Sequence, residues 1–92
     1  MNGIIYKYTL PIQGISSIQM PKGANIIECS EQNGFACIWA IVEPENETEL
    51  ITFKMFKTGQ VIEDIHLLQY IGCAKMFVGQ ELCLYVFKVI IV

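Results

Sequence analysis

The sequence has no arginine, a single aspartate and a single histidine, and only 16% of its 92 residues are charged. Nine acidic residues outnumber six lysines, which gives a net charge of −3, and the lysines are scattered along the chain. Binding a nucleic-acid duplex requires clustered Lys and Arg side chains that release counterions from the phosphates. The composition therefore argues against a DNA or RNA duplex as partner. A small anionic ligand needs only one or two cations and stays open.

Side chains that commonly carry catalysis are also scarce. A dyad of His66 with a cysteine is one catalytic alternative, but cysteines in strand-like surroundings are usually small hydrophobic packing residues. The sequence has no Cys-x-x-Cys pair and no glycine-rich phosphate motif, and one histidine gives little basis for a zinc site. We therefore expect no enzyme activity, no catalytic residue, no metal and no cofactor. We also expect four free thiols, at Cys29, Cys37, Cys73 and Cys83.

Signals for secretion or membrane insertion are missing as well. The N-terminal segment MNGIIYKYTL has no basic region followed by a long apolar one, which a signal peptide requires. The longest uncharged apolar run, Phe35 to Val42, has less than half of the length that a membrane-spanning helix needs. These observations lead us to expect a cytoplasmic protein with no membrane partner.

Alternation of apolar and polar residues with β-branched and aromatic clusters recurs throughout the chain, and no helical apolar stripe is present. This pattern predicts an all-β fold of about seven strands in one domain, residues 1–92. An antiparallel sandwich and a partly open barrel both fit it. An irregular connection with at most one helical turn is expected over Val61–Gln69. The predicted strands are Ile4–Leu10, Ile15–Met20, Asn25–Gln32, Phe35–Glu43, Leu50–Lys57, Tyr70–Val78 and Glu81–Val92.

Turn residues separate these strands. Asn33-Gly34 is the strongest hairpin signal, because both central positions of a type I′ turn need a positive φ. Pro21-Lys22-Gly23 and Thr58-Gly59-Gln60 also predict turns. Gly79-Gln80 predicts a two-residue type II′ turn, which has glycine in the first position. The run of glutamates from Glu43 to Glu49 is most simply a solvated loop.

The chain is 53% hydrophobic, which is high for a domain whose small core hides a limited surface. Exposed apolar surface on small proteins usually marks contacts, so we expect a homo-oligomer, a dimer or a tetramer. The last predicted strand is apolar on both faces. It must therefore be central to the fold or lie in a subunit interface, because an exposed apolar edge would invite aggregation.

Two features suggest a ligand site, and each has a simpler structural interpretation. Trp39 shares a strand face with Phe35, Cys37 and Ile41, so the pattern favours a core anchor over a stacking platform for a base. The turn Lys57-Thr58-Gly59 offers an ammonium, a hydroxyl and backbone N–H groups to an anion, but it also reads as an ordinary hairpin turn. Phe56 and Tyr70, near strand ends, are the better candidates for exposed aromatic side chains.

Several segments together resemble a family of small phage and bacterial proteins of otherwise uncharacterised function. The segments are YKYTLPI, MPKGANII, QNGFACIWAIVEPE, TGQVI, YIGCAKM and LYVFKV. The resemblance runs from Tyr6 to about Val89. The most specific pieces are Pro21 to Ala24, the Asn-Gly hairpin leading into Ile38-Trp39-Ala40, and Tyr70-Ile71-Gly72. The chain departs from the family at Lys57, where a Gly-Thr-Gly turn is expected.

Small acidic proteins of this kind also resemble the phage anti-CBASS sponges, which bind cyclic dinucleotides such as cyclic GMP-AMP between subunits and do not cleave them. This resemblance implies immune evasion in the host cytoplasm. It implies stacking of a base on Trp39, Phe56 or Tyr70, and phosphate contacts from a second set of residues: Lys54, Lys57, Thr58 and Gly59. The main alternative is a non-enzymatic phage module that binds proteins or has a structural role. A phosphodiesterase is disfavoured by the missing metal ligands.

Overall fold

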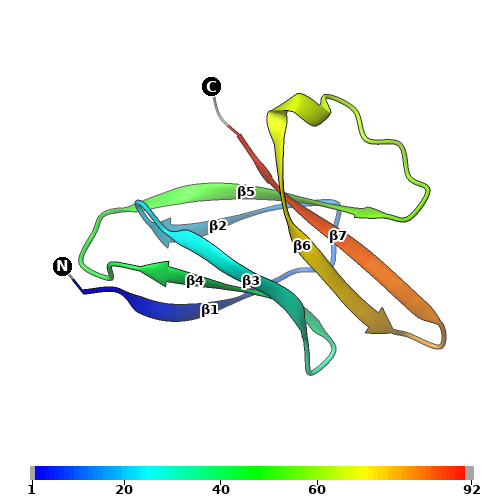
Figure 1. The fold of residues 1–92 in the computed structure, drawn as a ribbon, viewed down its shortest axis with the longest axis horizontal. Coiled ribbons are helices and arrows are strands. Elements are labelled where there is room, and N and C mark those ends of the chain that lie inside the picture. The colour runs from blue at the N-terminus through cyan, green and yellow to red at the C-terminus, as the bar shows by residue number, and fades with distance from the viewer. Residues whose placement is uncertain (1, 91–92) are drawn as a thin grey trace.

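The computed structural model describes residues 2–90, which form seven strands and one short 3-10 helix (Figure 1). The strands pair only in antiparallel fashion, as a three-stranded sheet in the order β1-β4-β3 and a four-stranded sheet in the order β2-β5-β7-β6. The predicted all-β sandwich of about seven strands is confirmed. The elements are β1 (Ile4–Leu10), β2 (Ile15–Pro21), β3 (Asn25–Gln32), β4 (Phe35–Val42), β5 (Thr48–Lys57), η1 (Ile65–Leu67), β6 (Leu68–Phe77) and β7 (Glu81–Val89).

The inner faces of the two sheets share one hydrophobic core. The described residues extend only 16 Å along their shortest axis, which is the thickness of two sheets and their side chains. Alternation directs every second residue of β5 inward, so Phe53 and Met55 are buried. The largest fully buried side chains are Leu10, Met20, Ile38, Val42, Phe53 and Val86.

The strand order differs from the chain order because β5 pairs with β7 rather than with β6. This makes β7 an internal strand, with Leu84 and Val86 buried on its inner face. The central position leaves β7 with no free edge, and the apolar residues of its inner face belong to the core, whereas Tyr85 and Phe87 on its outer face are only half-buried. Of the predicted strand Glu81–Val92, residues 91 and 92 lie outside the described residues.

The structure tests two of the predicted hairpin turns, one between β3 and β4 and one between β6 and β7. Asn33 and Gly34 have φ values of 53° and 84°, and Gln32 pairs with Phe35, so the two-residue turn is confirmed. The turn between β6 and β7 was predicted to have two residues and instead has three, because Phe77 pairs with Glu81. The prediction of a type II′ turn at that place is wrong.

The connection from β5 to β6 is irregular, as predicted, and contains one helical turn, η1, which includes His66. Leu68 and Gln69, expected in this connection, belong to β6. Nowhere between residues 2 and 90 is there a helix with the length and apolar character needed to cross a membrane.

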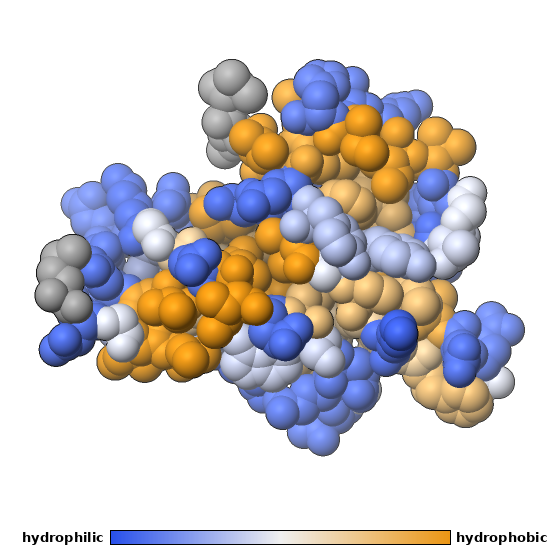
Figure 2. All heavy atoms as spheres, in the orientation of Figure 1, coloured by the Kyte–Doolittle hydropathy of each residue, from blue (hydrophilic) through white to orange (hydrophobic). Residues whose placement is uncertain are grey.

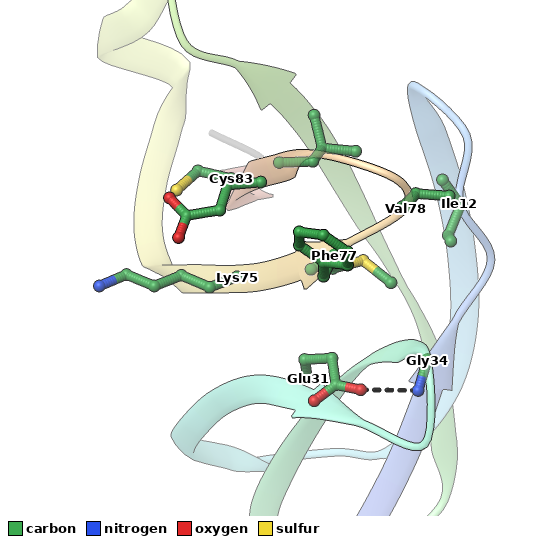
Figure 3. Close-up of a pocket in the computed structure, with 10 residues that line it drawn as sticks. Ile12, Glu31, Gly34, Lys75, Phe77, Val78 and Cys83 are labelled. Carbon is green, nitrogen blue, oxygen red and sulfur yellow. Dashed lines mark hydrogen bonds between the residues drawn. The ribbon is translucent and has the colours of Figure 1, made fainter.

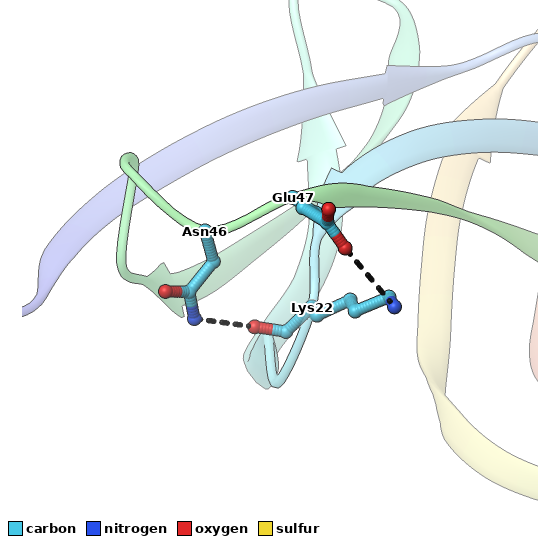
Figure 4. Close-up of polar contacts among 3 residues, drawn as sticks. All are labelled: Lys22, Asn46 and Glu47. Atoms are coloured by element: carbon cyan, nitrogen blue, oxygen red, sulfur yellow. Dashed lines mark hydrogen bonds and ion pairs between the residues drawn. The ribbon is translucent and has the colours of Figure 1, made fainter.

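The glutamate-rich loop between β4 and β5 is tied to the turn between β2 and β3 (Figure 4). The backbone N–H of Lys22 donates to the Glu47 carbonyl over 2.7 Å, and the Asn46 side-chain amide donates to the Lys22 carbonyl over 3.0 Å. Lys22 Nζ also lies 3.5 Å from the Glu47 carboxylate. Because an exposed ion pair contributes little, the bonds to the backbone hold this loop in place.

One edge of each sheet is brought together where β3 lies against β6. A Cβ placed on Gly72 of β6 would lie only 2.7 Å from the Cβ of Cys29 on β3. Glycine is therefore required at this position, because it lets the two backbones approach. On this side the two sheets meet closely.

Candidate functional site

The outer face of the four-stranded sheet carries a cluster of aromatic side chains. Phe87 of β7 is central: its ring centroid lies 5.6 Å from that of Phe56 on β5 and 5.3 Å from that of Tyr70 on β6. Tyr85 shares this side, because it pairs with Phe56 and lies two residues from Phe87. We call the outward-facing set Phe56, Tyr70, Tyr85 and Phe87 the aromatic face.

Polar groups border the aromatic face. Lys54 pairs with Phe87, so its side chain lies on the same face of the sheet as the Phe87 ring. At the end of β5, the Thr58 hydroxyl donates to the Tyr85 hydroxyl over 3.3 Å. Gly59 follows with a φ of 87°. The sequence-predicted residues Lys54, Phe56, Thr58, Gly59 and Tyr70 thus come from one region of the molecule.

Tyr70 is the most accessible part of the aromatic face, with 54% of its surface exposed. Burial, with a smaller contribution from the neighbouring Cys73 thiol, raises the pKa of the Tyr70 hydroxyl. The hydroxyl is therefore protonated at neutral pH and can donate a hydrogen bond. An exposed ring with a donor at its tip suits a planar polar ligand.

The Lys57 side chain points to the side of the sheet opposite the aromatic face. It pairs with Leu84, whose side chain is buried in the core, so alternation directs Lys57 away from the aromatic face. Its backbone N–H donates to the Gln60 side-chain carbonyl over 3.0 Å, and the Gln60 N–H donates to the Lys57 carbonyl over 3.1 Å. These bonds close the predicted turn, and they occupy one of the backbone donors that an anion would use.

A hollow of about 450 Å³ lies beside the aromatic face, between β5 and the connection to η1. Lys54 and Phe56 line one side of it, and the carboxylates Glu63 and Asp64 line another. A ligand here would meet an aromatic ring, one cation and two hydrogen-bond acceptors. Such an arrangement favours a molecule that carries both an anion and N–H donors.

Trp39 lies far from this site in the fold. It is half-buried on the outer face of the three-stranded sheet, opposite Lys7 on β1 and Glu28 on β3. The prediction that Trp39 anchors the core is wrong, and β4 is covered by a second layer only on its other face. No alternation rule could decide this, because both faces of β4 are apolar.

Cys37 is buried although it shares the outer face with Trp39. The reason is a bridge across the sheet: Lys7 Nζ of β1 donates to the Gln32 side-chain oxygen of β3 over 2.7 Å. By register Lys7 lies opposite Trp39 and Gln32 opposite Phe35, so the bridge runs diagonally across the position of Cys37. Thr9, the partner of Cys37 on β1, adds a contact to its sulfur at 3.9 Å. The thiol is thereby shielded.

A second hollow, of about 730 Å³, lies between the ends of two hairpins (Figure 3). Glu31, whose carboxylate accepts the Gly34 N–H at 2.6 Å, faces Phe77 across it. Ile12 and Val78 form another wall. Phe77 is 77% exposed, so this hollow offers an accessible apolar side chain, and charged residues such as Lys75 and Glu81 also line it.

All four thiols are free, and two of them, Cys29 and Cys73, are poorly suited to nucleophilic chemistry. Burial, followed by the neighbouring Cys73, raises the pKa of Cys29 from 9.0 to about 11. Burial and a hydrogen bond with Cys83 also raise the pKa of Cys73. A thiol with a raised pKa carries little thiolate at neutral pH. Among the described residues, no group of three or more His, Cys, Asp or Glu side chains could hold a metal ion.

The raised pKa of Cys29 predicts a pH-dependent stability. The folded state keeps the proton that the unfolded chain loses near pH 9, so the stabilisation is complete below pH 9 and is lost as the pH rises towards about 11. The free energy of unfolding should fall over this interval. Cys29→Ala should lack that part of the fall, as measured by urea unfolding at several pH values. Equal pH slopes for both proteins would contradict the assignment.

Phe87 and Tyr85 belong to the site but were not predicted as site residues. Alternation along the strand puts Cys83, Tyr85 and Phe87 on one face. It did not tell whether that face was turned to the core or to solvent. The signal was therefore present in the sequence, but its interpretation required the pairing of β7 with both β5 and β6.

The fold and the site define a small all-β sandwich protein with an exposed aromatic face. The chain belongs to a family described as a domain of unknown function (DUF7352), whose model matches residues 1–91. The expected membership of a small all-β family without an assigned function is thereby confirmed at this level. Neither the curated proteins nor the solved structures gave a match.

Proposed function

We propose that this protein is a phage sponge: it binds a cyclic dinucleotide on the aromatic face and sequesters it, without cleavage, as a homo-oligomer in the host cytoplasm. The observation that carries the proposal is the convergence of three rings from three strands around Phe87, with Tyr70 half-exposed. Stacking of a nucleobase on such a ring contributes about 1 to 3 kcal/mol and tolerates any base.

The groups around the rings match the other parts of a cyclic dinucleotide. The Lys54 ammonium can meet a phosphate, and the Thr58 and Tyr85 hydroxyls can hydrogen-bond to phosphate or ribose oxygens. Glu63 and Asp64, which also line the adjoining hollow, can accept hydrogen bonds from base N–H groups. A phosphate would be repelled by these carboxylates, so we assign the phosphate to the side of Lys54.

Sequestration requires no nucleophile and no metal. A protonated Cys29 or Cys73 thiol cannot attack a phosphodiester efficiently, because the thiolate is the reactive form. The protonated state of these two thiols therefore fits binding better than turnover. An enzyme would leave a linear or shortened nucleotide, whereas a sponge returns the ligand unchanged.

Substitution of Tyr70 tests the site. Tyr70→Ala removes a stacking surface and should weaken cyclic dinucleotide binding about 5- to 150-fold, the range that 1 to 3 kcal/mol represents. Lys54→Ala should also weaken binding, because the phosphate loses its cation. Isothermal titration of each variant with the nucleotide that the wild-type protein binds gives the dissociation constants.

Two matched variants serve as controls. Phe77→Ala removes a more exposed aromatic ring at the far hairpin, and Trp39→Ala removes the ring on the other sheet. Both should bind like the wild type. If Trp39→Ala abolished binding while Tyr70→Ala did not, the site would lie on the three-stranded sheet and the aromatic face would be the wrong assignment.

A non-enzymatic protein-binding module is the second candidate function. The observation that favours it is the hairpin end at Phe77 and Val78, which exposes apolar side chains beside the larger hollow (Figure 3). Exposed apolar surface of this kind commonly marks a protein contact. Absence of binding to every cyclic nucleotide, together with loss of a captured protein on Phe77→Ser, would favour this function over the sponge.

A further inference from the structure

The free edge of β1 differs from the other three outer edges of the two sheets. Exposed strand edges carry unpaired N–H and C=O groups, and proteins usually protect them with bulges, prolines, charges or covering segments. Edge strand β3 has a bulge between Ile26 and Glu28 and lies against β6, which has its own bulge between Tyr70 and Gly72. The edges of β3 and β6 are thus protected. Edge strand β2 has an unbroken register and a proline only at its last residue, Pro21, but Ile15 is its one exposed large apolar side chain.

Of these devices, strand β1 has only one charge, Lys7, and it exposes more large apolar side chains than β2 does. The seven residues of β1 pair with β4 in one unbroken register and include no proline and no glycine. Within residues 2–90, no strand pairs with its other edge. In Figure 1, β1 lies along the lower left border of the molecule. A regular, nearly uncharged free edge is a template for another strand.

Side chains on both faces of β1 are also uncovered. Ile5, on the outer face, is 58% exposed. Ile4 and Tyr6 pair with the buried residues Val42 and Ala40, so they point to the core side, yet they are 50% and 40% exposed. Figure 2 shows hydrophobic atoms gathered over the N-terminal end of β1 and the adjoining end of β4. The sandwich is therefore incomplete at this edge.

We infer that two copies of this chain pair through β1, as antiparallel strands centred on Tyr6, and so join two three-stranded sheets into one of six strands. A centre at Lys7 would set two ammonium groups opposite each other, which is unfavourable. If the two-fold axis passed at Ile5, only the residues from Ile4 to Tyr6 of each strand would find a partner. With the axis at Tyr6, all residues from Ile4 to Tyr8 are paired, and Ile5 lies opposite the partner's Lys7.

A second copy is the occupant that these features favour. A two-fold pairing uses the same edge on both molecules and closes after two copies. The exposed Ile4, Ile5 and Tyr6 make β1 the more apolar of the two regular free edges, so it is the edge that gains most from being covered. This contact deepens the proposed homo-oligomer by naming its surface, and it lies on the sheet opposite the aromatic face. It therefore does not depend on nucleotide binding.

Two substitutions of the same exposed residue test the pairing and its register. Ile5→Lys places a lysine opposite the partner's Lys7 and should raise the dimer dissociation constant at least about tenfold. Ile5→Glu places a carboxylate there and should leave the constant within about threefold of the wild-type value. Sedimentation equilibrium without nucleotide gives both constants, and circular dichroism verifies that each variant is folded.

Ile15→Lys is the matched control, because Ile15 is 55% exposed on the edge strand β2 and should leave assembly unchanged. Amide hydrogen exchange adds a backbone measurement. Alternate β1 amides should exchange faster in Ile5→Lys than in the wild type, while β4 amides should not change. A monomeric wild type, equal dissociation of the Lys and Glu variants, or dissociation caused by Ile15→Lys would overturn the inference. Loss of nucleotide binding in a protein that still dimerises would instead count against the sponge alone.

Discussion

Gly72→Ala should destabilise the protein by about 2 to 3 kcal/mol, the upper part of the usual range for an overpacked site. The added methyl carbon would lie 2.7 Å from the Cβ of Cys29, far inside the roughly 3.5 to 4 Å at which two carbons are in contact. The clashing atom is next to the backbone and cannot rotate away. The two edge strands β3 and β6 would therefore have to separate, which opens the core on that side.

Urea unfolding measures this loss, and Gly14→Ala is its control. A Cβ on Gly14 would meet nothing within 4 Å, so this variant should be neutral or gain a few tenths of a kcal/mol through a less flexible unfolded chain. Cys29→Gly combined with Gly72→Ala should be less destabilised than the sum of the two single variants, because the clashing carbon is gone. Equal stability of Gly72→Ala and wild type would show that β3 and β6 do not approach as described.

Phe53→Ala should cost about 3 to 5 kcal/mol, a large share of the roughly 5 to 15 kcal/mol that stabilises a domain of this size. Phe53 is 1% exposed and is the largest of the fully buried side chains. Its truncation leaves a cavity between two sheets that β-strand pairing holds apart, so the site cannot collapse to fill it. Thermal and urea unfolding should both show the loss, and part of the protein should be unfolded at physiological temperature.

Phe77→Ala provides the comparison, because it removes the same ring from a largely exposed position at the hairpin end. Its effect on stability should stay within about 0.5 kcal/mol of zero. If the two substitutions had similar effects on the free energy of unfolding, Phe53 would not be a core residue, and the inward assignment of β5 would be wrong.

The strands and their hairpins could be predicted because local signals determine them. Alternation fixed which residues of β5 and β7 share a face, and Asn33-Gly34 fixed a turn whose φ values few other residue pairs adopt. The acidic loop was recognised by its charge. The hydrogen bond from Asn46 to the β2–β3 turn joins segments that are distant in the sequence, so no local pattern predicts this bond.

The arrangement of the site could not be predicted in the same way. Phe56, Phe87 and Tyr70 meet because β7 lies between β5 and β6, an order that the chain sequence does not reveal. Trp39 was misplaced because β4 is apolar on both faces, so periodicity carried no information about the core side. The glycine at position 72 was a usable signal, since glycine inside a strand often marks a close backbone approach.

The most direct test of the proposed function is isothermal titration of the purified protein against a panel of cyclic di- and trinucleotides, with the bound ligand recovered after boiling. We predict tight, saturable binding of at least one cyclic dinucleotide and its recovery with the cyclic phosphodiester intact. Recovery of a linear product would contradict sequestration and indicate an enzyme. No heat signal across the whole panel would contradict nucleotide binding and leave the protein-binding module as the function to pursue.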